Sequence, residues 1–371
     1  MNKKDIEFLK DLTEAPSPSG WEVAAADVMR KRVKASADNI ETNVMGSVHA
    51  TLKAKKPAKG HKVGPSVMVA GHIDQVGMMV KYITDDGYIY FDPVGGIDAA
   101  ILPGQRVNLY ATGKSAGKPS VKPEKLRGMI GRKPIHLISA DERKTITPLD
   151  KLFVDVGLSG DEAKKRINIG DLMTYGMGFE EYGDGMAASL AFDDKLGVFI
   201  AVRVLEELKK AGGAKCDYVA AGTVQEEIGL RGGETSAYGV NPVIGISAEV
   251  GHATDYPEIE KSKYGEAKCG DGPLIARGPN INPVLYDRMI AAAKKAKAPY
   301  QIGPESRATG TDANPIQTSR GGKVAGLISI PLRYMHTPTE VLKLSDLDAA
   351  VKILTQFVLD LDDKVDFTPR Y

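Results

Sequence analysis

Several features of secreted and membrane proteins are missing from this chain. It has 2 cysteines in 371 residues, which is too few for a disulfide framework. Its apolar runs are far shorter than the ~20 residues that span a bilayer. The first residues, Met1-Asn-Lys-Lys-Asp, carry mixed charge in place of a hydrophobic leader. We therefore expect a cytoplasmic protein with no membrane partner.

An excess of one charge is also missing. The chain has 49 Lys+Arg against 48 Asp+Glu, so its formal net charge is +1. A balanced chain lacks the basic surface that nucleic acid requires, and we expect no nucleic-acid partner. The one basic stretch, residues 53–62, has no interleaved aromatic side chains and fits a solvated loop. Aromatic residues are scarce overall, with 1 Trp and 8 Phe.

The hydrophobic fraction of 42% is that of a globular protein, and at about 150 residues per domain the length predicts two domains or one with an insertion. Apolar spacing predicts helices at 4–13 and 21–34, with Ser19 as an N-cap of the second. Residues 76–180 instead show short alternating strands separated by Gly, Pro and Asp turns. We therefore predict an α/β domain, 1–75 and 181–371, interrupted by a small β domain, 76–180.

The other predicted elements complete this division. Outside the insertion we predict strand pairs within 39–52, strands at 67–70, 218–223, 243–249 and 323–330, and helices at 195–211, 283–297 and 345–361. Inside it we predict strands at 77–83, 88–92, 105–111, 128–131, 152–156 and 171–175. Gly113-Lys-Ser-Ala-Gly117 matches a nucleophile elbow, but Pro119 follows it, so the required helix is not expected.

A histidine and a carboxylate follow the strand at 67–70. In His72-Ile-Asp74 the two polar side chains lie on one side of an extended chain. Open α/β sheets place ligands at this end of a strand. The pair fits a metal ligand with an orienting acid behind it, and equally a loop histidine hydrogen-bonded to an aspartate.

Paired acids occur at two further element ends. Asp193 and Asp194 precede an amphipathic helix, where a single aspartate suffices as N-cap, so the second favours a ligand role. Glu226 and Glu227 follow the strand at 218–223, and like charges this close repel unless a cation or proton separates their states. One glutamate could bind metal while the other acts as general base, although a solvated acidic pair remains the simpler alternative.

Two more strands end in candidate ligands. Glu249 ends one apolar run, and His336 follows another. With His72, Asp193 and Glu227 they make two imidazoles and three carboxylates, a set that suits two divalent cations about 3.5–4 Å apart. Nitrogen and oxygen donors without thiolate favour Zn²⁺, with Co²⁺ or Mn²⁺ as alternatives.

The chain resembles the M42 aminopeptidases, a family of dinuclear metallopeptidases related to the zinc exopeptidases. The resemblance spans nearly the whole chain and runs in family order through Gly71-His-Ile-Asp-Gln-Val-Gly77, Val94-Gly-Gly96, Asp193-Asp-Lys-Leu-Gly197, Val224-Gln-Glu-Glu-Ile-Gly-Leu-Arg-Gly232, Thr309-Gly-Thr-Asp312 and Pro331-Leu-Arg-Tyr-Met-His-Thr-Pro338. It implies a zinc-exopeptidase-like domain with a mixed central sheet and an inserted PDZ-like barrel that mediates dimerisation.

The resemblance also implies a set of roles. One metal would be held by His72, Asp193 and Glu249, and the other by Asp193, Glu227 and His336. Glu226 would be the general base and Asp74 would orient His72. Asp193, rather than Asp194, is taken as the bridging residue because the related clan uses the first aspartate before a cis peptide. Two positions depart from the family, which usually has Asp at Glu249 and Arg at Lys195.

The expected activity is removal of N-terminal residues from peptides, in dimers that assemble into a dodecamer. The loop holding Arg307, Thr309, Thr311 and Asp312 is expected near the substrate pocket, but its preferred residue is left open. Two alternatives remain. Paired carboxylates also serve glycoside hydrolases of endoglucanase type, although histidines and scarce aromatic platforms argue against that. The β domain could instead be a non-catalytic peptide-binding module that acts by strand addition.

Overall fold

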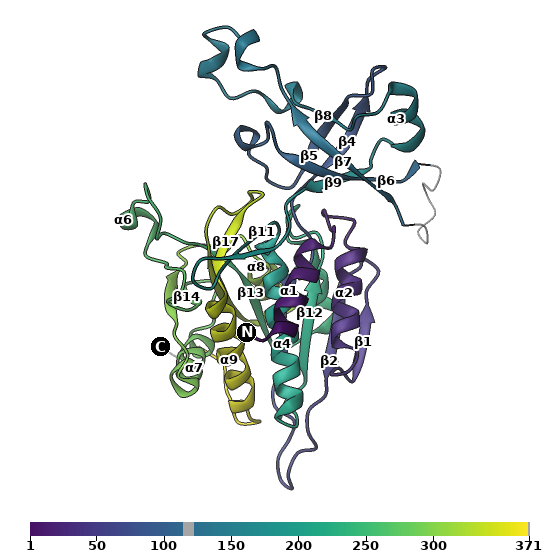
Figure 1. The fold of residues 1–371 in the computed structure, drawn as a ribbon. Helices are drawn as coiled ribbons and strands as arrows, with labels where there is room; N and C mark the ends of the chain where they lie inside the picture. The colour runs from purple at the N-terminus through teal and green to yellow at the C-terminus, as the bar shows by residue number, and fades with distance from the viewer. Residues whose placement is uncertain (114–121, 370–371) are drawn as a thin grey trace.

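The protein folds into an α/β body with a separate β-barrel above it (Figure 1). The structure is a computed structural model and describes residues 1–113 and 122–369. Most of the Gly113–Gly117 motif therefore lies outside the described residues. In the part of the chain that is described, no helix is both long and apolar enough to cross a membrane.

A mixed eight-stranded sheet forms the centre of the body, in the order β1-β2-β12-β3-β13-β16-β14-β15. Its strands are β1 (Asn39–Thr42), β2 (Val48–Leu52), β3 (Val67–His72), β12 (Tyr218–Thr223), β13 (Ile244–His252), β14 (Leu274–Arg277), β15 (Gln301–Pro304) and β16 (Val324–Leu332). The four central strands β12, β3, β13 and β16 are parallel to one another. On either side, β2 and β14 pair antiparallel with β12 and β16, so the predicted mixed central sheet is confirmed.

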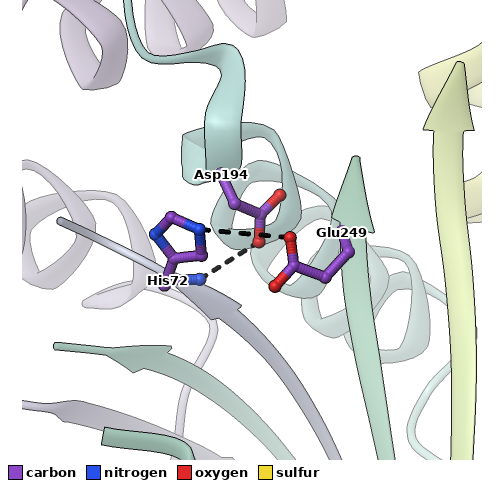
Figure 2. A group of neighbouring side chains, drawn as sticks. All are labelled: His72, Asp194 and Glu249. Carbon is purple, nitrogen blue, oxygen red and sulfur yellow. Dashed lines mark hydrogen bonds and ion pairs between the residues drawn. The ribbon is translucent and has the colours of Figure 1, made fainter. Parts of the chain in front are cut away.

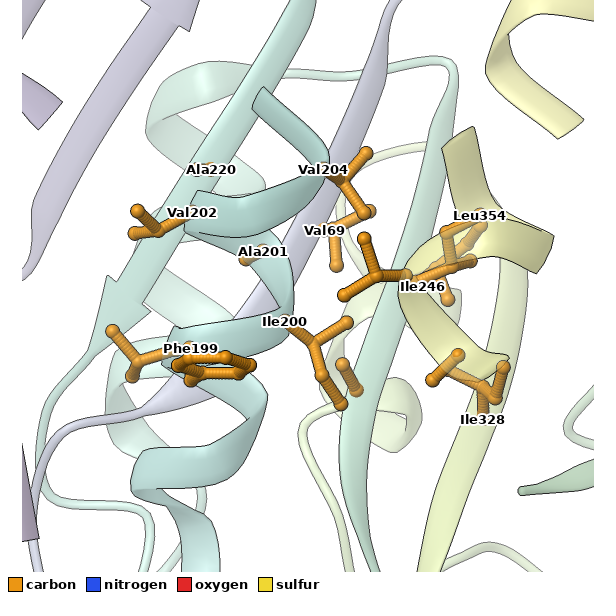
Figure 3. Close-up of a cluster of buried hydrophobic side chains, with 14 of the residues drawn as sticks. Val69, Phe199, Ile200, Ala201, Val202, Val204, Ala220, Ile246, Ile328 and Leu354 are labelled. Carbon is orange, nitrogen blue, oxygen red and sulfur yellow. The ribbon is translucent and has the colours of Figure 1, made fainter. Parts of the chain in front are cut away.

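Helices cover both faces of this sheet because its central strands carry apolar side chains on both faces. Val67 and Val69 of β3 face one layer, while Met68 and Ala70 face the other. The first layer holds α1 (Lys3–Glu14), α2 (Val23–Val33), α4 (Phe192–Lys210), α7 (Pro283–Ala296) and α9 (Leu344–Asp360), and the second holds α5 (Arg231–Val240) and α8 (Ala313–Thr318). Figure 3 shows Ile200 and Val204 of α4 packed between the sheet and α9.

The barrel closes in the order β4-β5-β8-β7-β6-β9 around a core of its own. Its elements are β4 (Gly77–Ile83), β5 (Ile89–Val94), β6 (Arg106–Ala111), β7 (Glu124–Gly131), β8 (Phe153–Asp155), α3 (Gly160–Arg166) and β9 (Leu172–Tyr175), with 3-10 turns at Ala99–Ile101, Ile135–Leu137, Glu142–Lys144 and Leu149–Lys151. All six predicted strands are present. The strand predicted at 128–131 begins four residues earlier.

A small three-stranded sheet also belongs to the body. It contains β10 (Glu180–Tyr182), β11 (Met186–Ser189) and β17 (Glu340–Lys343), and α6 (Lys261–Tyr264) lies on a projecting segment. The predicted N-cap role of Ser19 is wrong. Helix α2 begins at Val23, after Glu22, and the Ser19 hydroxyl donates to Asp74 Oδ2 at 2.6 Å instead. A buried carboxylate is the stronger acceptor for this hydroxyl.

Helix α4 lies unusually close to the sheet because two glycines meet there. A Cβ on Gly71 would fall 2.2 Å from the backbone carbon of Gly197, and a Cβ on Gly197 would fall 2.0 Å from the carbonyl oxygen of Ala248. Gly197 thus lets the start of α4 approach the ends of β3 and β13.

We expect Gly197→Ala to lower the free energy of unfolding by about 3 kcal/mol, since the added methyl group meets rigid backbone. Urea unfolding followed by circular dichroism measures this change. The matched control is Gly239→Ala, because a Cβ on that helical glycine meets nothing within 4 Å. It should leave stability unchanged or raise it slightly. Equal unfolding midpoints for the two variants would contradict the close packing.

Candidate metal centre

The predicted site residues come together at one edge of the central sheet. The parallel strands β12, β3, β13 and β16 end on the same side, so the segments after these strands lie close to one another. His72 is the last residue of β3, Glu226 and Glu227 come after β12, and Glu249 lies near the end of β13. His336 comes after β16, and the start of α4 adds Asp193.

Both histidines present the same ring nitrogen to the site. His72 Nδ1 lies 3.0 Å from the carbonyl oxygen of Asp74, and His336 Nδ1 lies 2.9 Å from that of Gly96. A carbonyl can only accept, so each Nδ1 carries a proton, and each Nε2 is the ring atom that faces the site: it donates to a carboxylate when the ring is protonated and offers an electron pair when the ring is neutral. The two Nε2 atoms are therefore available as metal ligands.

Asp193 lies between these two nitrogens. Its Oδ1 is 3.1 Å from His72 Nε2, and its Oδ2 is 3.3 Å from His336 Nε2. Burial opposes ionisation of Asp193, but the hydrogen bonds from His336 and His72 outweigh it and hold its pKa below the usual range. Each oxygen of one ionised carboxylate thus faces a different imidazole.

Two glutamates complete the cluster on either side. Glu227 Oε2 lies 3.4 Å from His336 Nε2, and Glu249 Oε2 lies 4.0 Å from His72 Nε2. The second oxygen of each, Oε1, is buried and has no hydrogen-bond partner among the described residues. Burial raises the pKa of Glu227 to about 8 and that of Glu249 well above its usual value. Buried acceptors without a donor are costly, and a divalent cation would satisfy both.

Asp194 occupies a different position from Asp193, and a cis peptide bond joins the two residues. Asp194 Oδ2 accepts from the His72 backbone N–H at 3.1 Å, and Oδ1 accepts from that of Gly197 at 3.0 Å. Burial raises the pKa of Asp194 well above its usual value, and the negative charge of Asp193 adds to this shift. Figure 2 shows Asp194 beside His72 and Glu249, and these three could also hold an ion. His72, Asp193 and Glu227 form the second such group.

Asp74 is fully buried and holds the neighbouring segment in place. Its Oδ1 accepts from the Glu226 backbone N–H at 3.0 Å, and its Oδ2 accepts from that of Glu227 at 3.2 Å. Its Oδ1 also lies 3.5 Å from His72 Nδ1. One carboxylate therefore fixes the loop that carries both glutamates relative to a histidine of the cluster.

Glu226 is an acid of the cluster region that faces the adjoining cavity, as Asp193, Glu227 and Glu249 do. It lines a cavity of about 850 Å³, and its Oε2 is 3.7 Å from His72 Nε2. Burial raises its pKa to about 7, with His72 opposing the shift and Asp312 adding to it. A general base works best when its pKa is close to the working pH.

The sequence profile of M42 glutamyl aminopeptidases matches residues 51–353. The chain belongs to this family. Over 369 residues it is 32% identical to the lysyl aminopeptidase of Pyrococcus furiosus, covering 98% of this chain and 99% of that one. A TET aminopeptidase from Thaumarchaeota archaeon SCGC AB-539-E09 superposes with a TM-score of 0.87 at 31% identity, covering 97% of this chain and 98% of that one. This protein is an M42 aminopeptidase.

Two other solved structures bear on assembly and on the glycosidase alternative. The TET1 peptidase of Pyrococcus horikoshii, which can assemble into a tetrahedron or a large octahedral shell, superposes with a TM-score of 0.80 at 25% identity, with 96% and 100% of the two chains covered. A Thermotoga maritima protein described as an endoglucanase superposes with a TM-score of 0.71 at 29% identity, with 94% and 96% covered. Proteins described as peptidases and as endoglucanases therefore share this fold.

Two contacts in this M42 aminopeptidase were not predicted from its sequence. Glu340 is buried, and its Oε2 accepts from the Asp193 backbone N–H at 3.0 Å while Oε1 accepts from that of His336 at 2.9 Å. Burial raises its pKa to about 8. Gly96 brings the barrel domain into the site through its carbonyl at His336. Nothing in the local sequence around Glu340 marks it, and Gly96 stood in the resemblance only as part of the Val94-Gly-Gly96 stretch, with no role assigned to it.

Lys195, one of the two positions expected to depart from the family pattern, is completely buried. Its Nζ donates to the carbonyl oxygen of Ala15 at 2.6 Å, to Gln75 Oε1 at 2.7 Å and to the carbonyl oxygen of Thr13 at 3.4 Å. Burial lowers its pKa to about 7. Three acceptors satisfy the three N–H bonds of an ammonium, so lysine suffices to tie α1 and Gln75 to the start of α4.

The loop expected near the substrate pocket reaches the cavity in part. Thr309 and Thr311 line it, while Asp312 lies beneath and its Oδ2 accepts from the Thr223 hydroxyl at 2.6 Å. Arg307 is not among the lining residues. His252, the last residue of β13, also lines the cavity.

Proposed function

We propose that this aminopeptidase removes N-terminal residues at a centre for two divalent cations. His72, Asp193 and Glu249 would hold one ion, and Asp193, Glu227 and His336 the other. The observation that carries the proposal is the placement of Asp193, whose two oxygens each face the Nε2 of a different histidine. A single carboxylate between two imidazoles is the arrangement expected of a bridging ligand.

The donor set supports zinc, with cobalt or manganese as alternatives. Two imidazole nitrogens and carboxylate oxygens suit these ions, and no thiolate is needed. The buried, unpartnered Oε1 atoms of Glu227 and Glu249 fit the same interpretation. When bound, such ions supply Lewis-acid activation of water and of the scissile carbonyl.

We assign the proton transfers to Glu226. Its carboxylate would take a proton from the attacking water and return it to the departing amine of the cleaved bond. A pKa of about 7 suits both steps, because the group can hold and release a proton near neutral pH. Asp74 would support the reaction by holding the Glu226 backbone and the His72 ring.

We also propose that residues 76–180 form a dimerisation domain and that dimers assemble further into a dodecamer. The shell-forming TET1 relative supports this proposal, as does the independent core of the barrel. The contact between Gly96 and His336 gives the same domain a second role beside the site. If the whole chain were a non-catalytic peptide-binding protein, the buried cluster of carboxylates and histidines in the body would have no explanation.

Chelation tests the proposal directly. After dialysis against EDTA we expect hydrolysis of amino-acid anilides to fall to background and to return when Zn²⁺, Co²⁺ or Mn²⁺ is added. The reason is that the proposed chemistry needs Lewis acids, whereas a two-carboxylate glycosidase needs none. Hydrolysis of cello-oligosaccharides, measured in parallel, is the control. Anilide hydrolysis that survives complete metal removal would contradict the two-ion mechanism.

A further inference from the structure

The ionisable side chains that line the cavity beside the cluster are mostly acidic, with His252 and His336 as the histidines among them. Besides the four carboxylates of the cluster region, two more acids line it, Glu266 and Glu305, and no lysine or arginine is among its described lining residues. The four inner carboxylates, Asp193, Glu226, Glu227 and Glu249, carry as much negative charge as two divalent cations carry positive charge. The charge of the outer cavity therefore depends on Glu266 and Glu305.

These two glutamates differ in their partners. Glu266 is exposed and forms ion pairs with Lys261 Nζ at 2.8 Å and Lys268 Nζ at 3.1 Å. The carboxylate of Glu305 is half-buried and has no hydrogen bond or ion pair with any described residue. Burial raises the pKa of Glu305, with only His252 opposing the shift. Glu305 is therefore the outer carboxylate of this wall that has no hydrogen bond or ion pair with a described residue, and His252 is the one group that favours its charged form.

The backbone around Glu305 is held firmly. Its N–H donates to the carbonyl oxygen of Arg277 at 2.9 Å, which extends the pairing of β14 with β15. Gly278 packs against the same residue so closely that a Cβ there would lie 1.7 Å from the Glu305 carbonyl oxygen. Because the backbone of Glu305 is already fixed at the sheet edge, this residue loses little backbone freedom when a ligand binds, and it can serve as a recognition point.

The wall around Glu305 has an apolar part as well. Leu274 and Ala276 of β14 and Leu327 of β16 line the same cavity. Long cationic side chains pack their methylene groups on such surfaces and place the charged end against a polar group. The combination matches lysine or arginine better than an acidic or a purely aliphatic residue.

We propose that Glu305 selects peptides whose N-terminal residue is lysine or arginine. The inference rests on the proposed two-ion site, because the residue accepted by this wall must be the one whose peptide bond lies at the cluster. Glu305 contributes an ion pair to the side chain of the substrate and takes no part in the bond cleavage. Its effect therefore belongs to recognition and should appear mainly in KM.

Anilides of lysine, arginine, leucine and glutamate, with zinc-loaded enzyme, test the proposal. We expect kcat/KM for lysine to exceed that for leucine, and Glu305→Gln to lower this ratio about tenfold, the loss of roughly one ion pair. Glu305→Asp should retain the preference because it keeps the charge. Glu258→Gln is the control, since this glutamate is exposed and is not among the lining residues of the cavity, and it should leave the ratio within about twofold.

The outcomes separate this inference from the function on which it rests. Wild-type enzyme that cleaves leucine or glutamate anilide fastest overturns the role of Glu305 and leaves the aminopeptidase site intact. An unchanged lysine-to-leucine ratio in Glu305→Gln with full metal content does the same. Failure to cleave any of the four anilides after zinc loading overturns both.

Discussion

Replacing Glu226 with glutamine should lower kcat by about 10²–10⁴-fold, the usual contribution of a general base, while the chain keeps its metal ions. Glutamine has the same shape but cannot accept the proton of the attacking water. The backbone at this position is held by Asp74 Oδ1 at 3.0 Å, so the new side chain should occupy the same place. Anilide turnover measures the loss, and mass spectrometry of the metals measures the ion content.

Glu227→Gln is the matched comparison, because it changes the adjacent residue in the same way. Glu227 Oε2 lies 3.4 Å from His336 Nε2, and its Oε1 is buried without a partner among the described residues. Its loss should therefore lower the ion content, and added zinc should restore part of the activity. Glu226→Gln should not respond to added zinc. If Glu226→Gln keeps substantial turnover, or loses its ions, the base is another group.

The fold could be predicted largely because its strands are short and sharply patterned. The run Val67-Met-Val-Ala70 is apolar on both faces and forms the buried strand β3, and the alternating segments between Gly77 and Tyr175 form the barrel. The two short strands β14 and β15 at the sheet edge were not predicted. Each has only four residues, and their pairing depends on a close approach at Gly278 that local sequence does not encode.

The position of the candidate site could be predicted from topology more than from any single motif. Each motif had a simpler explanation, but parallel neighbours must end at one edge of a sheet, and that brings His72, Glu249 and His336 together. The resemblance to the M42 family then supplied an expected role for each residue. The motifs are far apart in the sequence, and the parallel strands that precede them bring their side chains together in the folded chain.

The supporting contacts could not be predicted for a physical reason. Glu340 accepts hydrogen bonds from backbone N–H groups of Asp193 and His336, which are 147 and 4 residues away in the chain. A hydrogen bond to a backbone amide leaves no signature in the side chains that surround it. Ser19 illustrates the same limit, since its place before a helix indicated a cap, whereas the buried carboxylate of Asp74 was the stronger acceptor.

Changing each aspartate of the pair at α4 to asparagine should separate the bridging residue from its neighbour. We expect Asp193→Asn to reduce the ion content below that of any other single-ligand variant, because this carboxylate faces both histidines. Its activity loss should exceed the roughly 10–100-fold that results from changing an outer partner of a metal ligand. Metal analysis of the folded chain, together with zinc titration calorimetry, measures the effect.

Asp194→Asn should behave differently because both oxygens of Asp194 already accept backbone N–H groups, those of His72 and Gly197. An amide can accept with only one of its two ends, so one buried N–H loses its partner and stability should fall by about 1–3 kcal/mol. The ion content should stay near that of the unchanged protein. The reverse result, with Asp194→Asn losing its ions and Asp193→Asn retaining them, would assign the bridge to Asp194, beside His72 and Glu249. Because the two residues adjoin and receive the same substitution, a difference in ion content would come from where each carboxylate points.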